Sequence, residues 1–305
     1  MFPIIPANSA QGVSATQKAI FGYGLTGSVV SITNLVSSSG VVGSDVTGVG
    51  TARRSIAAAG YGTDKAIFGY GFSTADVSIT NLVSNSGVVA TDTTGVGTAR
   101  RQLAATGYGV DTAIFGYGYN GSSVVSLTNL VSNTGVVSSD TSGVGTARSV
   151  LAAAGYGSTG QAIFGYGTST GDGSGRLSLT NLVSNTGVVA ANVTGVGTGR
   201  YSLAAASYGT DKAIFGYGAN ASDVAISMTN LVSNTGIIAA DVTGVGTAKS
   251  GLAAASYGTD KAIFGYGQGV ATTNLVSNTG VVAANVTGVG TARYGSAAAG
   301  YSTSA

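Results

Sequence analysis

The sequence Phe-Gly-Tyr-Gly occurs six times, and this repetition limits the possible folds more than any other feature of the chain. The copies begin at Phe21, Phe68, Phe115, Phe164, Phe215 and Phe264, which lie 47, 47, 49, 51 and 49 residues apart. A period of this length indicates one supersecondary unit per repeat, packed against similar neighbours. We therefore expect one repeat domain over residues 18–305, preceded by an extended arm over residues 1–17 that contains both prolines.

The composition excludes several classes of function. The chain has no cysteine, histidine or tryptophan, and all its acidic residues are aspartates, so most catalytic bases, the usual transition-metal ligands and disulfides are missing. The net charge of +2 gives no attraction to nucleic acid. Polar residues and glycines interrupt every apolar run, which argues against membrane insertion. We expect no enzyme, no cofactor and no metal site.

Each repeat is predicted to form four short antiparallel strands. In one copy the first strand is the alanine-rich segment 54–59, and the second is 65–71, which contains Phe-Gly-Tyr-Gly. The turn between them, Gly62-Thr63-Asp64-Lys65, has the residues of a tight hairpin. A third strand begins near Ser78, and a Gly-containing turn leads to a fourth strand. Because Phe and Tyr alternate with glycines, we expect both rings on one face of the second strand.

Nearly all the length variation among the repeats lies in one loop. From the Asn of Thr-Asn-Leu to the next Gly-Val-Gly the offset is 14 in all six copies, whereas from Phe to that Asn it is 13, 13, 14, 17, 15 and 10. The variable segment lies between the second and third strands. Since strand direction alternates, these loops and the Gly-Val-Gly connectors should emerge on one face, and the constant turns on the other.

Six such units resemble the blades of a β-propeller. The order of a basic residue, a small apolar strand, a hairpin and a strand ending in Gly-Tyr-Gly is similar to the kelch repeat, although the tryptophan of that repeat is absent here. The resemblance covers residues 18 to about 301 and implies a six-bladed propeller with four antiparallel strands per blade. A β-solenoid is the competing fold, but its coils are usually shorter and its terminal repeats atypical.

The phase of the repeats predicts how the ring closes. The repeat domain begins with a second strand, residues 18–24, and ends with an unpartnered first strand within residues 291–301. Pairing of this C-terminal strand with the N-terminal repeat would complete the last blade from both ends of the chain. The alanines suit strands that converge on an axis, and the aromatic side chains would fill the space between blades against glycines of the neighbour.

Two sets of side chains are candidate binding sites. The variable loops are the first set, although loop tips also drift without function. The second set is a basic ring near the pore mouth, which could hold an anion; alternatively, these cations cap backbone carbonyls or pair with nearby aspartates. The loop candidates are Tyr119, Asn120, Asp172, Arg176, Asn220 and Asp223. The ring candidates are Arg53, Arg100, Arg148, Arg200, Lys249 and Arg293. Matches to Gly-x-Gly-x-x-Gly have no βαβ context, so they do not predict dinucleotide binding.

The glycine-rich repeats also resemble propeller repeats of bacteriophage virion proteins, in particular tail or fibre components. This resemblance implies a non-enzymatic structural and recognition module in the virion, whose variable loops face a host surface glycan, a host protein or a partner subunit. The apolar residues Phe2, Ile4 and Ile5 of the arm would then dock on other virion proteins. A stand-alone lectin-like propeller is the alternative. A sialidase-like hydrolase is disfavoured because the arginines are symmetric repeats rather than a converging cluster.

Overall fold

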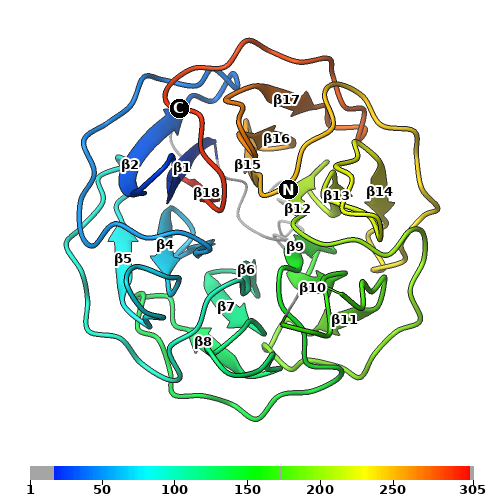
Figure 1. Ribbon diagram of the computed structural model, residues 1–305, viewed down its shortest axis with the longest axis horizontal. Helices are drawn as coiled ribbons and strands as arrows, with labels where there is room; N and C mark the ends of the chain where they lie inside the picture. The colour runs from blue at the N-terminus through cyan, green and yellow to red at the C-terminus, as the bar shows by residue number, and fades with distance from the viewer. Residues whose placement is uncertain (1–16, 172–173, 303–305) are drawn as a thin grey trace, which may run out of the picture.

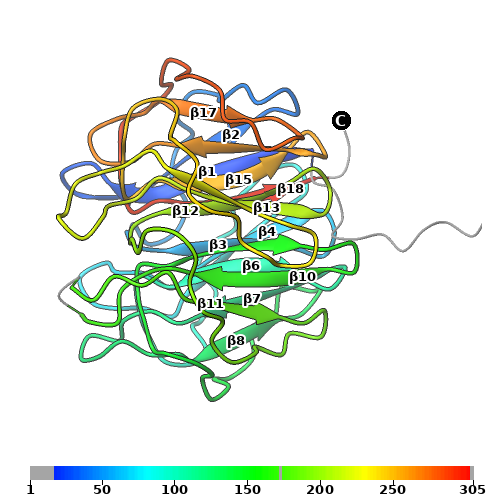
Figure 2. The same cartoon turned by 90° about the vertical axis from the view of Figure 1, so that its right-hand side faces the viewer.

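The computed structural model describes residues 17–171 and 174–302, and this part of the chain is all-β, without helices. Its strands form six three-stranded antiparallel sheets. The sheets are arranged around a common axis in a propeller-like disc (Figure 1). Seen from the side, the strands run through the thickness of the disc (Figure 2). The expectation of an all-β repeat fold is confirmed.

Every sheet has the same three kinds of strand. The strands nearest the axis are β3 (Ala57–Tyr61), β6 (Ala104–Tyr108), β9 (Ala152–Tyr156), β12 (Ala204–Tyr208), β15 (Ala253–Tyr257) and β18 (Ala297–Tyr301). The middle strands are β1 (Lys18–Leu25), β4 (Lys65–Gly69), β7 (Thr112–Gly116), β10 (Gln161–Gly165), β13 (Lys212–Gly216) and β16 (Lys261–Gly265). The outer strands are β2 (Val29–Val36), β5 (Thr80–Val83), β8 (Thr128–Val131), β11 (Thr180–Val183), β14 (Thr229–Val232) and β17 (Thr273–Val276).

The sheets are numbered here in chain order of their middle strands. Sheet 1 has the order β18-β1-β2, and sheets 2 to 6 are β3-β4-β5, β6-β7-β8, β9-β10-β11, β12-β13-β14 and β15-β16-β17. Sheet 1 is therefore built from both ends of the described chain. In its register Ile20 pairs with Ala299 and Phe21 with Ala298, so the predicted pairing of the C-terminal strand with the N-terminal repeat is present.

The prediction of four strands per repeat is wrong, because the outermost segment makes only isolated bridges. In sheet 2 these bridges are Thr80↔Thr93 and Val83↔Val89. Between the two bridges β5 advances three residues and the outer segment four, so one residue of the outer segment has no partner, as at a bulge. The side chain of Asn81 lies at this irregularity. Its Nδ2 donates a hydrogen bond to the carbonyl oxygen of Ala90 at 3.0 Å, in place of a regular backbone ladder. The buried asparagine thus bonds the outer segment at the point where the backbone ladder is irregular, and the regular sheet has three strands.

The core consists of six similar interfaces between neighbouring sheets. Between sheets 1 and 2, Ile20 and Tyr23 pack against Ala66 and Phe68. The phenyl ring lies against a glycine, since a Cβ built on Gly22 would be 2.8 Å from Cζ of Phe68. The expectation that aromatic rings fill the space between units against glycines of the neighbour is confirmed. Any side chain at Gly22 would force the two sheets apart.

The expectation that Phe and Tyr share one face of the strand is wrong. Phe68 packs toward sheet 1, where its ring is 5.1 Å from that of Tyr23, whereas Tyr70 packs toward sheet 3, with its ring 5.1 Å from that of Phe115. Tyr70 has φ of 63°, in the left-handed region, and this reverses the alternation of the strand. One repeat therefore supplies an aromatic ring to both of its neighbours.

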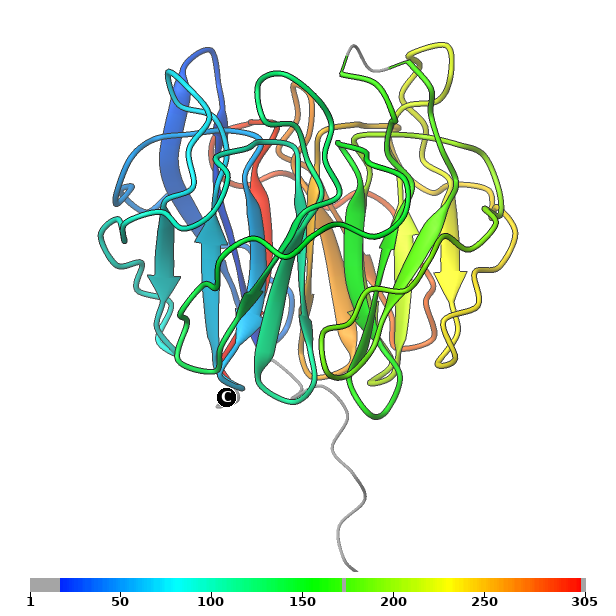
Figure 3. The same ribbon diagram turned by 90° about the horizontal axis from the view of Figure 1, so that it is seen from below.

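The two faces of the disc differ as predicted. The variable loops between middle and outer strands lie on one face, and the tight turns between inner and middle strands lie on the other (Figure 3). We call these the variable face and the constant face. On the constant face the turns donate backbone hydrogen bonds to the adjacent sheet, such as Gly62 N to Asp111 O at 2.7 Å. Ser302, directly after β18, makes the equivalent bond from its N to Asp64 O at 2.8 Å.

Candidate functional site

The six cations of the predicted basic ring are buried between the sheets. Arg53, Arg100, Arg148 and Arg200 are 0% exposed, Arg293 is 1% and Lys249 is 2% exposed. Each lies at the end of a Gly-Val-Gly connector, where the chain passes from one sheet to the next. These side chains have no surface on which to hold a ligand or partner.

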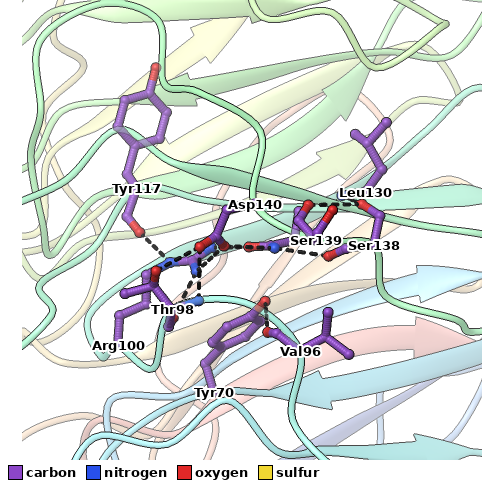
Figure 4. Close-up of polar contacts among 10 residues, drawn as sticks. Tyr70, Val96, Thr98, Arg100, Tyr117, Leu130, Ser138, Ser139 and Asp140 are labelled. Carbon is purple, nitrogen blue, oxygen red and sulfur yellow. Dashed lines mark hydrogen bonds and ion pairs between the residues drawn. The ribbon is translucent and has the colours of Figure 1, made fainter.

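Arg100 is an example of these buried cations with a full set of contacts (Figure 4). Its Nε donates to the carbonyl oxygen of Tyr117 at 2.9 Å, and its Nη2 donates to Oδ1 of Asn129 at 2.6 Å. Its guanidinium carbon lies 4.4 Å from the ring centroid of Tyr70 in the preceding sheet. Asp140 Oδ1 is 3.7 Å from its Nη1. One arginine therefore stacks on one sheet and bonds to the next, which fixes the sheets relative to each other.

An aspartate lies beside four of the six cations and is held there in its ionised form. Burial alone would raise the pKa of Asp140, but hydrogen bonds from Thr98 and Asn129 and the charge of Arg100 together lower it below its usual value. Thr98 contributes both its backbone N and its Oγ1, at 2.9 and 2.6 Å from Oδ2 of Asp140. The carboxylate thus anchors the connector as well as the arginine.

Two of the six cations lack this carboxylate. Asn192 replaces the aspartate beside Arg148, and Asn285 replaces it beside Lys249. Lys249 donates to Asn274 Oδ1 at 2.9 Å and to Thr272 O at 3.1 Å, and burial lowers its pKa to about 8. Because the unfolded lysine binds a proton up to about pH 10.4, this site opposes folding at neutral pH, and stability should rise between about pH 8 and 10.4.

We expect Asn285→Asp to stabilise the protein at pH 7 by about 1 kcal/mol, because it places a carboxylate near Lys249. The new charge should also raise the pKa of Lys249 and so remove the rise in stability above pH 8. Denaturant midpoints at pH 7 and pH 9.5 measure both effects. Asn192→Asp is the matched control: it should stabilise without changing the dependence at alkaline pH, since Arg148 does not titrate there. A lower midpoint for Asn285→Asp at pH 7 would contradict the expectation.

The variable face carries a second set of side chains that the repeats do not share. In five of the six repeats the residue after the buried cation forms a β-bridge to the start of the variable loop, as in Arg54↔Phe72, Arg101↔Tyr119 and Tyr201↔Ala219. At this position the six repeats have Arg54, Arg101, Ser149, Tyr201, Ser250 and Tyr294. The predictions from sequence missed this position, although the difference is visible when the repeats are aligned with one another.

Over sheets 2 and 3 these residues form a stacked row. The guanidinium carbons of Arg54 and Arg101 lie 5.4 and 4.9 Å from the ring centroid of Phe72, and Arg101 also lies 4.9 Å from the ring of Tyr119. Asp76 Oδ1 accepts a hydrogen bond from Arg101 Nη1 at 2.9 Å. Tyr119, a predicted site residue, is therefore part of a built cluster rather than a free loop tip.

Over sheets 4 and 5 the structure brings together two more of the predicted residues. Arg176 forms an ion pair with Asp223 and lies 4.9 Å from the ring centroid of Tyr201. The hydroxyl of Tyr201 donates to Asp223 Oδ1 at 2.9 Å, and burial together with this carboxylate raises the pKa of Tyr201. The cluster joins the variable loops of two adjacent sheets.

The remaining predicted site residues are not part of these two clusters. Asn120 accepts hydrogen bonds from the backbone N of Ser122 and Ser123, so its side chain holds its own loop. Asn220 acts in the same way toward Ser222 and Val224. Asp172 and the arm residues Phe2, Ile4 and Ile5 lie outside the described residues.

Comparisons with known proteins leave the sequence resemblance without independent support. No protein-family model matches the chain, and no curated protein matches it significantly. In the described part of the chain, no helix has the length and apolarity to cross a membrane, and no three potential metal ligands of the His, Cys, Asp or Glu type gather at one point.

Proposed function

We propose that this protein is a non-enzymatic recognition module whose variable face contacts a host surface glycan, a host protein or a partner subunit. The proposal rests on one observation: the features in which the repeats differ are concentrated on one face of the disc. The inner strands, most of the constant face and the positions of the buried cations are repeated around the disc. Nearly all the variation in loop length, and the charged and aromatic clusters described above, lie on the other face. Such a face provides several distinct contacts on one rigid frame.

The proposal includes a six-bladed propeller held shut by the two ends of the chain. Pairing of β18 with β1 completes sheet 1 and brings Arg293 to the interface between sheets 6 and 1, where its guanidinium carbon is 4.1 Å from the ring centroid of Tyr266. Hydrogen bonds on the constant face, including Gly258 N to Gln17 O at 3.0 Å, connect sheet 6 to the start of sheet 1. A closed ring would give the variable face a fixed geometry.

We place this module in a virion, as a tail or fibre component anchored by its arm, on the basis of the sequence resemblance. Mass spectrometry of purified particles tests the location, and deletion of residues 2–6 tests the anchor. The lectin-like alternative is favoured by the aromatic side chains on the variable face, since aromatic rings stack on sugars. Under that alternative the isolated protein binds glycans without any particle.

Shortening one variable loop should abolish recognition without unfolding the protein. We would replace residues 119–127 with residues 268–272, the equivalent and shortest connection. This change removes Tyr119 from the stacked row, so binding to host cells or to arrayed surface polysaccharides should fall at least about tenfold, with little change in melting temperature. Asn133→Ser, on the constant face, introduces the residue found at the equivalent Ser38 and is the control. Equal binding by the loop variant and the control would refute the role of the variable face.

A further inference from the structure

The mouth of the central channel on the variable face is a concave site whose aliphatic wall is interrupted by polar residues at one edge. Its wall contains Ile56, Leu103, Leu151, Leu203 and Leu252, which are 5–6% exposed. The sixth position in this circle is the small polar Ser296. Arg54 and Tyr294 also line the mouth, and Tyr294 is 36% exposed. Arg54 and Tyr294 belong to adjacent sheets and their backbones lie close together. A Cβ built on Gly295, the residue after Tyr294, would be 3.7 Å from Cβ of Arg54.

The backbone around this mouth is held by a circle of hydrogen bonds. Six residues at equivalent positions have positive φ, and each backbone N donates to the carbonyl oxygen of the preceding member. The six bonds are Ser55 to Gly295, Gln102 to Ser55, Val150 to Gln102, Ser202 to Val150, Gly251 to Ser202 and Gly295 to Gly251, at 2.7–3.0 Å. Val150 adopts φ of 55° despite its branched Cβ, a costly conformation for this residue type. The rim is therefore rigid, and these N–H groups are already satisfied.

Arg54 is the one charged side chain among the described residues that line this mouth. Among the described residues its guanidinium has no hydrogen-bond or ion-pair partner, in contrast to Arg101, which pairs with Asp76, and Arg176, which pairs with Asp223. Stacking at 5.4 Å from the ring centroid of Phe72 keeps it in place. A guanidinium positioned in this way keeps its hydrogen-bond donors available for a planar anion such as a carboxylate.

We infer that the mouth of the channel binds a sugar that carries a carboxylate, with Arg54 bonding the carboxylate and the ring of Tyr294 stacking on the sugar. This inference rests on the proposed recognition function and specifies its ligand. The planar fork of arginine matches a carboxylate, the exposed tyrosine provides an aromatic surface beside it, and the aliphatic wall accepts an apolar substituent. Among the described residues that line the mouth only one is a cation, and the chain has a net charge of only +2, so the site does not suit a polyanion such as nucleic acid.

The test compares acidic and neutral members of matched sugar pairs by calorimetric titration. The probes are 3′-sialyllactose against lactose, and trigalacturonate against its methyl ester. We expect the wild-type protein to bind at least one acidic member about tenfold or more tightly than its neutral counterpart. Arg54→Ser introduces the residue found at the equivalent Ser149 and should remove this preference. Tyr294→Ser should weaken binding of both members of the pair.

Lys18→Gln is the control, because it removes one positive charge from the constant face and introduces the residue found at the equivalent Gln161. It should leave the preference unchanged. The inference is overturned if acidic and neutral sugars bind equally, if none of the four probes binds at millimolar concentration, or if Lys18→Gln has the effect of Arg54→Ser. If in these cases the loop replacement still abolishes binding to host cells, the proposed function stands and only its ligand is wrong. If the loop replacement has no effect either, both fail.

Discussion

Deletion of residues 291–305 is expected to lower the melting temperature by about 10 °C or more. The deletion removes β18, so that β1 loses its inner partner and the small, buried residues Ala297, Ala298 and Ala299 leave the axis. It also removes Tyr301, which is 2% exposed, and the bond from Ser302 to the turn of sheet 2. Sheet 1 would retain only β1 and β2, and two-stranded sheets are marginally stable in water.

Addition of the missing segment as a separate peptide distinguishes loss of this strand from general damage. A synthetic peptide of residues 291–305 should bind the truncated protein and restore part of its melting temperature, whereas a peptide of the same composition in scrambled order should not. Melting curves by circular dichroism measure both. An unchanged melting temperature after the deletion would show that the ends of the chain do not hold the ring together.

The sequence predicts much of this architecture because the repeats give the same information six times. The fixed offset of 14 residues from the Asn to the next connector and the phase of the two ends are enough to place the C-terminal strand beside the N-terminal repeat. The pairing of large aromatic residues with glycines is also predictable, since a ring such as that of Phe68 needs a facing residue without a side chain.

Two expectations are wrong, four strands per repeat and Phe and Tyr on one face of the second strand. Both have local causes that are not visible in the alternation of residues along a strand. Asn81 appears in the sequence as one residue of an extended segment, yet its side-chain amide bonds the outer chain where the ladder is irregular. Tyr70 adopts positive φ between two glycines, a conformation that is unusual for a large residue. Asn81 bonds to Ala90, nine residues further along the chain, and Tyr70 packs its ring against Phe115 of the next sheet.

The candidate site was predicted only in part, because composition does not distinguish a buried cation from an exposed one. Arg53 and Arg54 are adjacent, but the first faces the interface between sheets 1 and 2 and the second faces the channel mouth. The repeat pattern itself separates them. A cation follows every connector at the first position, as packing requires, whereas the second position differs among the repeats.

Arg53→Met is expected to destabilise the protein by about 3–5 kcal/mol. Arg53 is 0% exposed, and its side chain donates to Tyr70 O at 2.8 Å, Thr51 O at 2.9 Å and Asn81 Oδ1 at 2.6 Å. Methionine keeps much of the aliphatic volume beside Tyr23 but leaves these acceptors without their donors and Asp92 without its nearby cation, at 3.8 Å. Such a loss is a large part of the stability of an ordinary domain.

Arg54→Met makes the same chemical change one residue later and should alter the free energy of unfolding by less than about 0.5 kcal/mol. Its side chain stacks on Phe72, a contact that methionine can partly replace. Chemical denaturation of the two variants under one set of conditions gives the comparison directly. If the two variants unfold at the same denaturant concentration, the buried cations do not join the sheets, and the stability of the disc would then depend on the aromatic and glycine contacts alone.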